Sequence, residues 1–361
     1  MTGVDARADR NPPPAGERAP EALEQNSEAW DEFVAASPQP THLQTTAWAE
    51  IKRANGWRPL RLAGQAGRSV VGAQLLVRRA AGVPWGLGYV PRGPVGDAVN
   101  VEALARFTDR ARDAAPGARL AWVRIEPELE VGAGHEQTLA RLGWRRAPHV
   151  QPESTRIIDL KRPLDEVWND LHRKCRQSVN KARRLGIRVV DADGDRLSDF
   201  YRIHTSAAGR AGIIPRTEST YRQMWQALAP RGMARLLFAE REETGEAVAT
   251  LFLVSCGQRV VDLYGGTTAE GDSTRANYVL KWEAIERCRE WGFAEYDLWG
   301  LPRAGIAQFK ASFGGREVHY VGAWDLTTDR IGRAVLQAGL ATRATYLRFR
   351  YGRRSGGEEG D

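Results

Sequence analysis

The sequence predicts an α+β fold of two tandem domains, each with a mixed, mostly antiparallel sheet flanked by helices. Two observations carry this prediction. The chain has 361 residues, which is enough for two hydrophobic cores of ordinary size. The same order of elements also occurs twice: three strand-like apolar runs separated by glycine-containing turns, then a long helix, a strand, a short helix and a last strand. We interpret the two halves as a duplication.

The first half begins with a helix over 27–37, capped by Asn26 or Ser27, and a second helix that ends before Gly56. The remaining elements follow in the expected order: strands at 59–62, 70–77 and 85–90, a helix at 101–114, a strand at 120–126 and a short helix before Gly143. The second half repeats this order: strands at 234–240, 247–255 and 259–265, a helix at 277–291, a strand at 295–299 and a short helix through 309–313.

An antiparallel meander followed by a helix and a strand is the order of the GNAT acyltransferase fold. We therefore expect one GNAT-like domain at 26–160 and a second at 232–328. The segment 161–231 between them has an almost wholly helical pattern. A disordered leader at 1–25, a basic helix at 329–354 and a tail at 355–361 complete the expected organisation.

The composition, with 42% hydrophobic and 27% charged residues, is that of a globular protein without a transmembrane segment or signal peptide. We expect a cytoplasmic monomer that also meets the inner face of the membrane if the basic C-terminal segment binds lipid. The net charge of +7 favours a polyanionic partner. The three cysteines and six histidines match no metal-ligand spacing, so we expect reduced thiols, no metal and no cofactor.

Five motifs in one order across 44–324 resemble the FemABX family. They are QTTAWAEIK at 44–52 with GW at 56–57, YVPRGPV at 89–95 with Asp97, RKCRQSVNKA at 173–182, YGG at 264–266 with Tyr278 and Trp282, and DLWG at 297–300 with FK at 309–310 and FGG at 313–315. The segment 197–228 has no sustained heptads, so the likeness is to FemX-like members without a coiled-coil arm.

This resemblance implies an aminoacyltransferase of peptidoglycan biosynthesis. Such an enzyme transfers Gly, Ala or Ser from aminoacyl-tRNA to the stem-peptide amine of a UDP-MurNAc-pentapeptide or a lipid-linked muropeptide, which begins an interpeptide bridge of the cell wall. One alternative is an N-acyltransferase that uses acyl-CoA, although the turns at 91–100 and 266–277 lack the pyrophosphate loop of that class. Another is a non-catalytic protein that binds tRNA or a membrane.

The resemblance also implies that the acceptor site lies in the first domain, 26–160. Lys52 and Arg216 correspond to the residues that bind the diphosphate, and Trp48 is in register with Lys52. Fixed cations suit this anion, and an arginine offers a bidentate fork. The alternative is a solvated helix lysine and a loop arginine.

Tyr89, Asp97 and Tyr264 lie at glycine-rich turns, where they either contact the acceptor or simply pack. Asp97 matches an acid once suspected as a general base. The family's second tyrosine of the acceptor site falls on Thr220 here, with Tyr221 one position later.

Lys310 and Phe309 are the candidate catalytic pair. Acyl transfer from an ester to an amine passes through an oxyanion, which needs positive charge nearby, and Lys310 matches the family position that supplies it. Phe309 is in place to stack on the terminal adenine of tRNA, or is a core residue. No Ser-His-Asp or Cys-His arrangement is readable, so we expect direct attack without a covalent enzyme intermediate.

Two segments are strongly basic. The helix at 171–185 has no acidic residue, and its cations Arg173, Lys174, Arg176 and Lys181 are expected to contact tRNA phosphates. The stretch 329–354 contains seven arginines and one aspartate among apolar residues. It is either an amphipathic helix that lies on an anionic bilayer or a helix packed on the second domain with a charged outer face.

Overall fold

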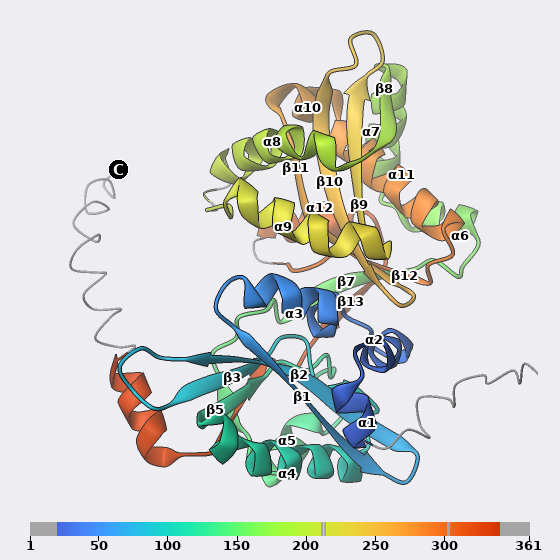
Figure 1. Cartoon of the computed structure of the whole chain (residues 1–361). Coiled ribbons are helices and arrows are strands. Elements are labelled where there is room, and N and C mark those ends of the chain that lie inside the picture. The colour runs from blue at the N-terminus through green and yellow to red at the C-terminus, as the bar shows by residue number, and fades with distance from the viewer. Residues whose placement is uncertain (1–19, 211, 213, 302–303, 340–361) are drawn as a thin grey trace, which may run out of the picture.

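The structure is a computed structural model that describes residues 20–210, 212, 214–301 and 304–339. It contains two mixed sheets, each flanked by helices, which confirms the expected α+β fold (Figure 1). Within the described residues, no helix is both long and apolar enough to cross a bilayer.

The first sheet has the strand order β1-β2-β3-β5-β14-β6, with β4 paired to β2. Its strands are β1 (Arg58–Ala66), β2 (Ser69–Arg79), β3 (Gly86–Val90), β4 (Val95–Gly96), β5 (Leu120–Ile125), β6 (Arg145–Ala147) and β14 (Ala323–Thr327). Only β3 and β5 are parallel, and the long helix α4 (Val101–Ala118) connects them and packs on the sheet. The short helix α5 (His135–Arg141) precedes β6.

The second sheet repeats this plan in the order β13-β7-β12-β11-β10-β9-β8. Its strands are β7 (Ser154–Asp159), β8 (Ile187–Ala192), β9 (Ala234–Arg241), β10 (Ala247–Cys256), β11 (Arg259–Thr267), β12 (Glu295–Asp297) and β13 (Arg316–His319). Again a single parallel pair, β11 and β12, is connected by a long helix, α11 (Ala276–Glu290). The short helices α10 (Ala269–Thr274) and α12 (Ala304–Ala311) flank this unit.

The two sheets exchange one strand with each other. β7 follows β6 in the chain but lies in the second sheet between β12 and β13, and β14 follows β13 but lies in the first sheet between β5 and β6. The expected first domain, 26–160, therefore includes β7, which belongs to the second sheet. The expected second domain, 232–328, includes β14, which belongs to the first sheet. Local apolar patterns show that a strand exists but not which distant strand it pairs with.

The connecting segment is not wholly helical. It contains the helices α6 (Leu164–Asp170), α7 (Arg173–Arg184), α8 (Leu197–Arg210) and α9 (Glu218–Leu228), and two short 3-10 turns, at Gly194–Arg196 and Ala229–Arg231. The stretch Ile187–Ala192 is instead β8, which pairs with β9 at the edge of the second sheet. Its β-branched residues favour a strand, and Gly186 ends the preceding helix with φ +68°.

The N-terminal helices are α1 (Pro20–Gln25), α2 (Ser27–Ala36) and α3 (Thr46–Arg53), with a 3-10 turn at His42–Gln44 before α3. Part of the leader expected to be disordered is thus helical, because Leu23 is buried against the first sheet. The rest of the leader, residues 1–19, lies outside the described residues. Thr45 caps α3 by accepting a hydrogen bond from the Trp48 N–H, and α3 lies between the two sheets (Figure 1).

An apolar cluster joins the two halves across this boundary. Leu43 and Trp48 of the first half pack in one cluster with Phe200, Tyr221 and Phe252 of the second. A buried ion-pair chain adds to the boundary: the Arg259 guanidinium contacts the carboxylate of Glu128 and, at 2.8 Å, that of Glu295. Because Arg259 and Glu128 are buried together, while Glu295 stays partly exposed, the cleft between the halves has fixed walls.

Candidate active site

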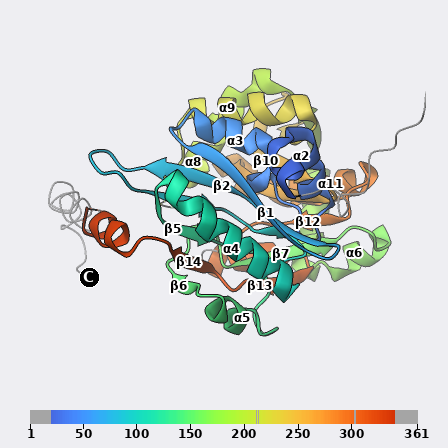
Figure 2. The ribbon, with the colours of Figure 1, turned by 60° about the horizontal axis from the view of Figure 1, so that its bottom comes forward.

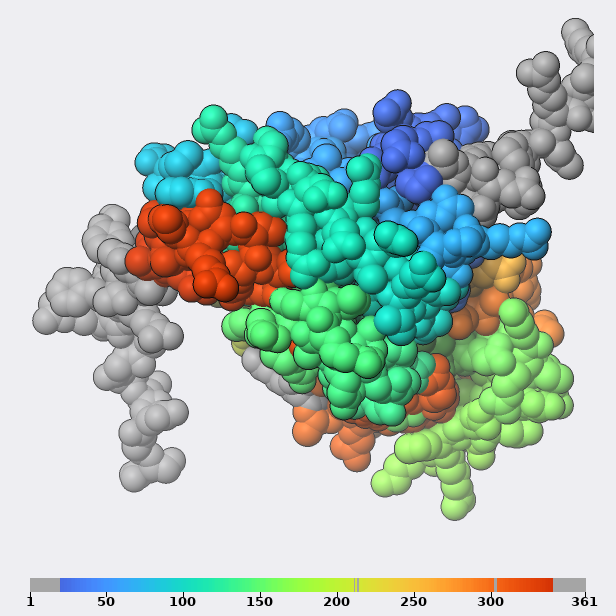
Figure 3. Space-filling view, turned by 90° about the horizontal axis from the view of Figure 1, so that it is seen from below, coloured from blue at the N-terminus to red at the C-terminus, as the bar shows by residue number. Residues whose placement is uncertain are grey.

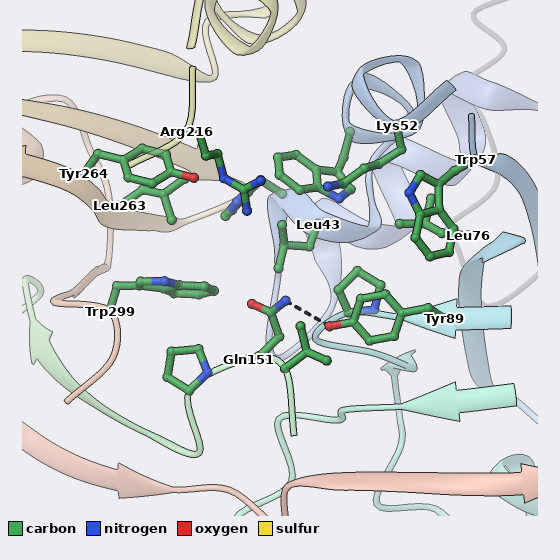
Figure 4. Close-up of a pocket in the computed structure, with 15 residues that line it drawn as sticks. Leu43, Lys52, Trp57, Leu76, Tyr89, Gln151, Arg216, Leu263, Tyr264 and Trp299 are labelled. Carbon is green, nitrogen blue, oxygen red and sulfur yellow. Dashed lines mark hydrogen bonds between the residues drawn. The ribbon is translucent and has the colours of Figure 1, made fainter. Parts of the chain in front are cut away.

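A cavity of about 410 Å³ lies between the two halves (Figure 4). Side chains from α3 and β3 of the first half face side chains from β11, the segment before α9 and the turn after β12 of the second. The structure brings five of the predicted site residues to this cleft: Trp48, Lys52, Tyr89, Arg216 and Tyr264. The two tyrosines occupy corresponding strands, β3 and β11, of the duplicated unit.

Two cations from different halves converge at the top of the cleft. Lys52 lies in the last turn of α3, with its ammonium nitrogen 4.7 Å from the centre of the Trp48 ring. Burial lowers the pKa of Lys52 to about 8, and the nearby positive charge of Arg216 adds to that shift. The described lining of the cleft contains no acidic side chain. Two like charges that face no acidic side chain in the described lining make this end of the cleft electropositive.

Tyr89 is held by a fixed hydrogen-bond network. Its hydroxyl donates to Glu126 Oε2 at 2.5 Å and accepts from Gln151 Nε2 at 2.9 Å. Burial raises the pKa of Tyr89 far above its usual value, and the Glu126 charge raises it further. The hydroxyl therefore stays neutral. Its proton is committed to Glu126, so Tyr89 positions the Gln151 amide at the cleft instead of donating to a ligand.

Tyr264 lies on the opposite wall, beside Arg216. Burial raises the pKa of Tyr264, while the Arg216 charge opposes the shift. Its ring centre lies 5.1 Å from that of Tyr221, whose hydroxyl is 3.0 Å from His204 Nε2. A second tyrosine thus contacts Tyr264, and it is Tyr221, one position after Thr220, where the resemblance placed it.

Asp97 lies outside the cleft, although the sequence placed it beside Tyr89. The chain turns after β3 so that β4 pairs with the start of β2, and Asp97 follows β4. Its carboxylate accepts a hydrogen bond from Ser69 Oγ at 2.6 Å and lines a separate hollow next to Phe33. The expectation that Asp97 contacts the substrate together with Tyr89 does not agree with this position.

Lys310 lies behind the cleft and supports one wall. Trp299, which lines the cleft, has φ +48° and donates its N–H to Asp297 Oδ1 at 2.8 Å. The Lys310 ammonium donates to the carbonyl oxygens of Trp299 and Gly300, the latter at 2.7 Å. Burial lowers the pKa of Lys310 to about 8, although the charge of Asp262 opposes the shift. In this conformation Lys310 is a positioning residue.

Phe309 is not at the cleft. Its ring packs against Tyr278 and Phe313, with centres 5.0 and 5.3 Å away. The half-buried ring belongs to the core of the second domain. A role in stacking on a base would need this aromatic cluster to open.

Sequence reasoning missed several residues of the cleft. His42 is buried there, and neither of its ring nitrogens has a hydrogen-bond partner within the described residues. Burial lowers the pKa of His42 to about 3, and Arg92 adds to the shift, so the imidazole is neutral. Arg92 itself stacks on Trp299 at 4.9 Å. The PRGP string contained Arg92, but no local signal pointed to His42.

The basic face of α7 is partly committed to the fold. Arg176 donates to the carbonyl oxygens at the end of α6, including that of Asn169 at 2.8 Å, so it caps that helix. Arg173, Lys174 and Lys181 are exposed. These three remain in place for the predicted contact with tRNA, whereas Arg176 is not free for it.

The thiols are poor nucleophiles in this structure. Cys175, Cys256 and Cys288 are buried, and burial raises the pKa of the first two to about 11 and about 12 and that of the third further. A thiolate is the reactive form of cysteine, so none of the three is activated.

Comparison with known proteins agrees with this architecture. The FemAB family matches residues 26–141, and the acetyltransferase (GNAT) domain matches residues 169–311. The lipid II:glycine glycyltransferase of Staphylococcus aureus is 31% identical over 221 residues, which are 58% of this chain and 52% of that protein. The chain thus spans about half the length of the curated relatives it matches.

Two solved structures share the fold. The crystal structure of FemX covers 84% of this chain and 96% of its own with a TM-score of 0.78 and 23% identity. A conserved protein of unknown function from Bacteroides thetaiotaomicron covers 83% of this chain and 95% of its own with a TM-score of 0.56 and 11% identity. These matches confirm two GNAT-like domains. The FemAB family match over residues 26–141 and the glycyltransferase relatives support the assignment to the FemABX family.

Proposed function

We propose that the chain is an aminoacyltransferase whose acceptor is the stem-peptide amine of a muropeptide carried on a diphosphate, either UDP or a lipid. The observation that carries the proposal is the meeting of Lys52 and Arg216, one from each half, in a cleft that has no acidic lining among its described residues. The S. aureus relatives are named for glycine transfer with lipid II, which makes glycine the first amino acid to test.

The physical argument concerns the cost of the two cations. Holding Lys52 charged beside Arg216 in a half-buried site is unfavourable, as the lowered pKa records. A diphosphate removes this cost because it places negative charge between the two groups, and the Arg216 fork matches phosphate oxygens. The rings of Trp48 and Trp57 beside them offer apolar surface for the group attached to the phosphate.

The donor in this proposal is aminoacyl-tRNA. The exposed cations Arg173, Lys174 and Lys181 on α7 form a face with no acidic residue of its own helix, which suits a phosphate backbone. The aminoacyl ester of tRNA is already activated for attack, so the protein needs to position two substrates more than it needs to supply a nucleophile.

The proposed reaction is a direct transfer. The acceptor amine attacks the ester carbonyl, a C–N bond forms, and the C–O bond to the tRNA ribose breaks. The leaving ribose oxygen takes up the proton that the amine loses, either directly or through a water molecule, and becomes a hydroxyl. The buried thiols are not activated for a covalent step. Lys310 fixes the Trp299 turn and thus the shape of the wall against which the reacting groups lie.

The test is a transfer assay with the purified full chain. The protein is incubated with UDP-MurNAc-pentapeptide or its lipid-linked form, a panel of tRNAs charged with Gly, Ala or Ser and, separately, acetyl-CoA, and the acceptor is weighed by mass spectrometry. We expect a gain of one amino-acid residue from one of the charged tRNAs. An acetyl gain without aminoacyl transfer, or an aminoacyl adduct on the protein itself, would contradict the proposal.

Two variants connect the assay to the site. Lys52→Met and Arg216→Met should raise the KM for the acceptor at least tenfold, because each removes one charge-assisted contact to the diphosphate. Lys161→Met, on an exposed lysine remote from the cleft, is the matched control and should leave the KM unchanged. Equal losses in all three variants would show that the effect is not specific to the cleft.

A further inference from the structure

The C-terminal helix and the β2–β3 hairpin form one continuous surface on the first domain. We call this surface the docking surface. It consists of residues 78–85 of the hairpin and its two strand ends, the helix at 330–339, and Arg145. Figures 2 and 3 show this helix, in red, beside the hairpin in cyan, at the edge of the molecule away from the second domain. This differs from the expected packing of the segment on the second domain. Residues 340–354 of the predicted basic helix lie outside the described residues.

The inner face of this helix is fixed to the sheet. Trp85 Nε1 donates to Asp329 Oδ2 at 2.8 Å, and Gly332 packs so closely on Trp85 that a Cβ there would meet the ring at 2.5 Å. Leu336 is buried against Trp122 of β5. The Asp329 carboxylate also caps the helix through the Gly332 N–H at 2.8 Å. The helix is therefore held in one orientation, and its other faces point outward.

The outer face is apolar. Ile331 is 71% exposed and Val335 is 40% exposed, although large aliphatic side chains usually prefer burial. Val335 also lines a groove of about 340 Å³ between the helix and the hairpin, where Val83 forms the other wall. Pro84 at the hairpin tip is exposed. Ile331, Val335 and Pro84 thus form an exposed apolar patch, and Val83 behind them packs against the cluster of Trp122 and Leu336.

Arginines flank the patch on both sides. Arg145, Arg330 and Arg333 line a hollow of about 440 Å³ beside the helix. Arg78 and Arg79 are exposed on the hairpin.

The nearby acids are already paired. Asp325 is buried between Arg124 and Arg333, at 2.8 and 3.0 Å, and Asp329 is hydrogen-bonded to Trp85. The surface thus combines excess positive charge with exposed aliphatic groups. The sequence beyond it, 340–354, adds five arginines and no acidic residue.

We propose that the docking surface binds an anionic lipid bilayer. The arginines would contact lipid phosphates, and Ile331 and Val335 would enter the boundary between headgroups and acyl chains, as in helices that lie in the membrane plane. The charge pattern favours a bilayer over a protein partner. A ring of arginines around exposed aliphatic side chains matches a surface that is anionic outside and apolar beneath.

The docking surface is next to the cleft. Strand β3 starts at Gly86 on the docking surface and reaches the cleft at Tyr89. The guanidinium of Arg78 lies 5.4 Å from the ring centre of Trp57, which lines the cleft. A lipid-linked diphosphate could therefore reach Lys52 while its chain stays in the bilayer. This choice of a lipid-linked acceptor rests on the proposed function, whereas membrane binding itself does not.

Flotation of the full chain with vesicles tests the proposal without any enzymatic assay. The probes are vesicles of phosphatidylcholine alone and of phosphatidylcholine with about 30% phosphatidylglycerol, the latter at low and high salt. We expect binding to the anionic vesicles only, weakened by salt. Arg330→Glu and Ile331→Asp should each lower the partition coefficient at least about fivefold. The matched controls are Lys161→Glu and Val131→Asp, which change an exposed lysine and a 53% exposed valine elsewhere.

The outcomes separate the two proposals. No flotation, equal flotation with neutral and anionic vesicles, or equal losses in the controls would overturn membrane docking. So would a dimer in sedimentation that Ile331→Asp dissociates, because the patch would then bind a second copy of the chain. If the docking variants lose flotation but the native chain transfers no amino acid to either the UDP-linked or the lipid-linked acceptor, the docking proposal stands and the proposed function fails.

Discussion

Binding of a diphosphate should draw a proton onto Lys52. In the free protein the pKa of Lys52 is about 8, so about half of the molecules carry a neutral amine at pH 8. A bound diphosphate restores the positive charge, because it supplies the counter-ion that the cleft lacks. We therefore expect an uptake of about 0.5 proton per ligand at pH 8, about 0.1 at pH 7 and about 0.9 at pH 9.

Calorimetry measures this uptake directly. A UDP-sugar, whose diphosphate diester keeps a constant charge over this range, is titrated into the protein in buffers of different ionisation enthalpy. The slope of the observed heat against the buffer enthalpy gives the number of protons. Lys52→Arg is the control, because an arginine keeps the charge but stays protonated, so it should bind the ligand with no uptake. A zero slope at pH 8 in the native chain, or the same slope in Lys52→Arg, would refute the reasoning.

The same pKa has a consequence for stability. The folded chain binds fewer protons at Lys52 than the unfolded chain between about pH 8 and the usual lysine value, so stability should rise with pH in that window. Below it, the folded state carries the cost of the half-buried charge, which is about 2 kcal/mol once solvent screening of the partly exposed ammonium is allowed for. Lys52→Met should therefore raise the free energy of unfolding at pH 7 by up to about 2 kcal/mol while it weakens ligand binding.

Three further predictions concern residues outside the cleft. Lys310→Met should lower kcat at least tenfold, because it removes the charge-assisted bonds that hold the turn of Trp299. For the same reason, kcat of the native chain should fall as the pH rises through about 8, where Lys310 becomes neutral. Glu128→Gln should lower the free energy of unfolding in urea by about 3 kcal/mol, because it removes the buried counter-ion of Arg259 and leaves only the partly exposed Glu295. A loss below about 1 kcal/mol would show that the Arg259–Glu128 pair is dispensable. Arg176→Gln should lower the free energy of unfolding by about 1 to 3 kcal/mol and leave the salt dependence of tRNA binding unchanged. Lys181→Gln should leave the free energy of unfolding unchanged and reduce the salt dependence of tRNA binding.

The sequence predicted those features that depend on local patterns. Strands such as β10 and β11 lie within about two residues of their expected bounds, because apolar runs between glycine turns define them. The family resemblance also placed Lys52 and Arg216 in one site, and the structure brings both to one cleft from different halves. Their roles in binding remain predictions.

The features that the sequence could not predict depend on long-range pairing. Asp97 is eight positions from Tyr89, yet the pairing of β4 with β2 carries it away from the cleft. Arg176 looks like its basic neighbours in the sequence, but only the position of α6 shows that it caps a helix. His42 carries no motif, and its place in the cleft follows from the packing of two halves.

Because β7 and β14 are exchanged, each half of the chain contributes one strand to the sheet of the other half. Arg124 and Asp325 bond at 2.8 Å across 201 positions, so during synthesis the edge of β5 stays unpaired until β14 has left the ribosome. Such late closure slows folding and exposes a strand edge that invites aggregation. It also means that a chain divided between the halves, for example near 162, should yield two fragments that are poorly folded alone. Expressed together, they can restore both sheets, since each fragment brings the strand that its partner lacks.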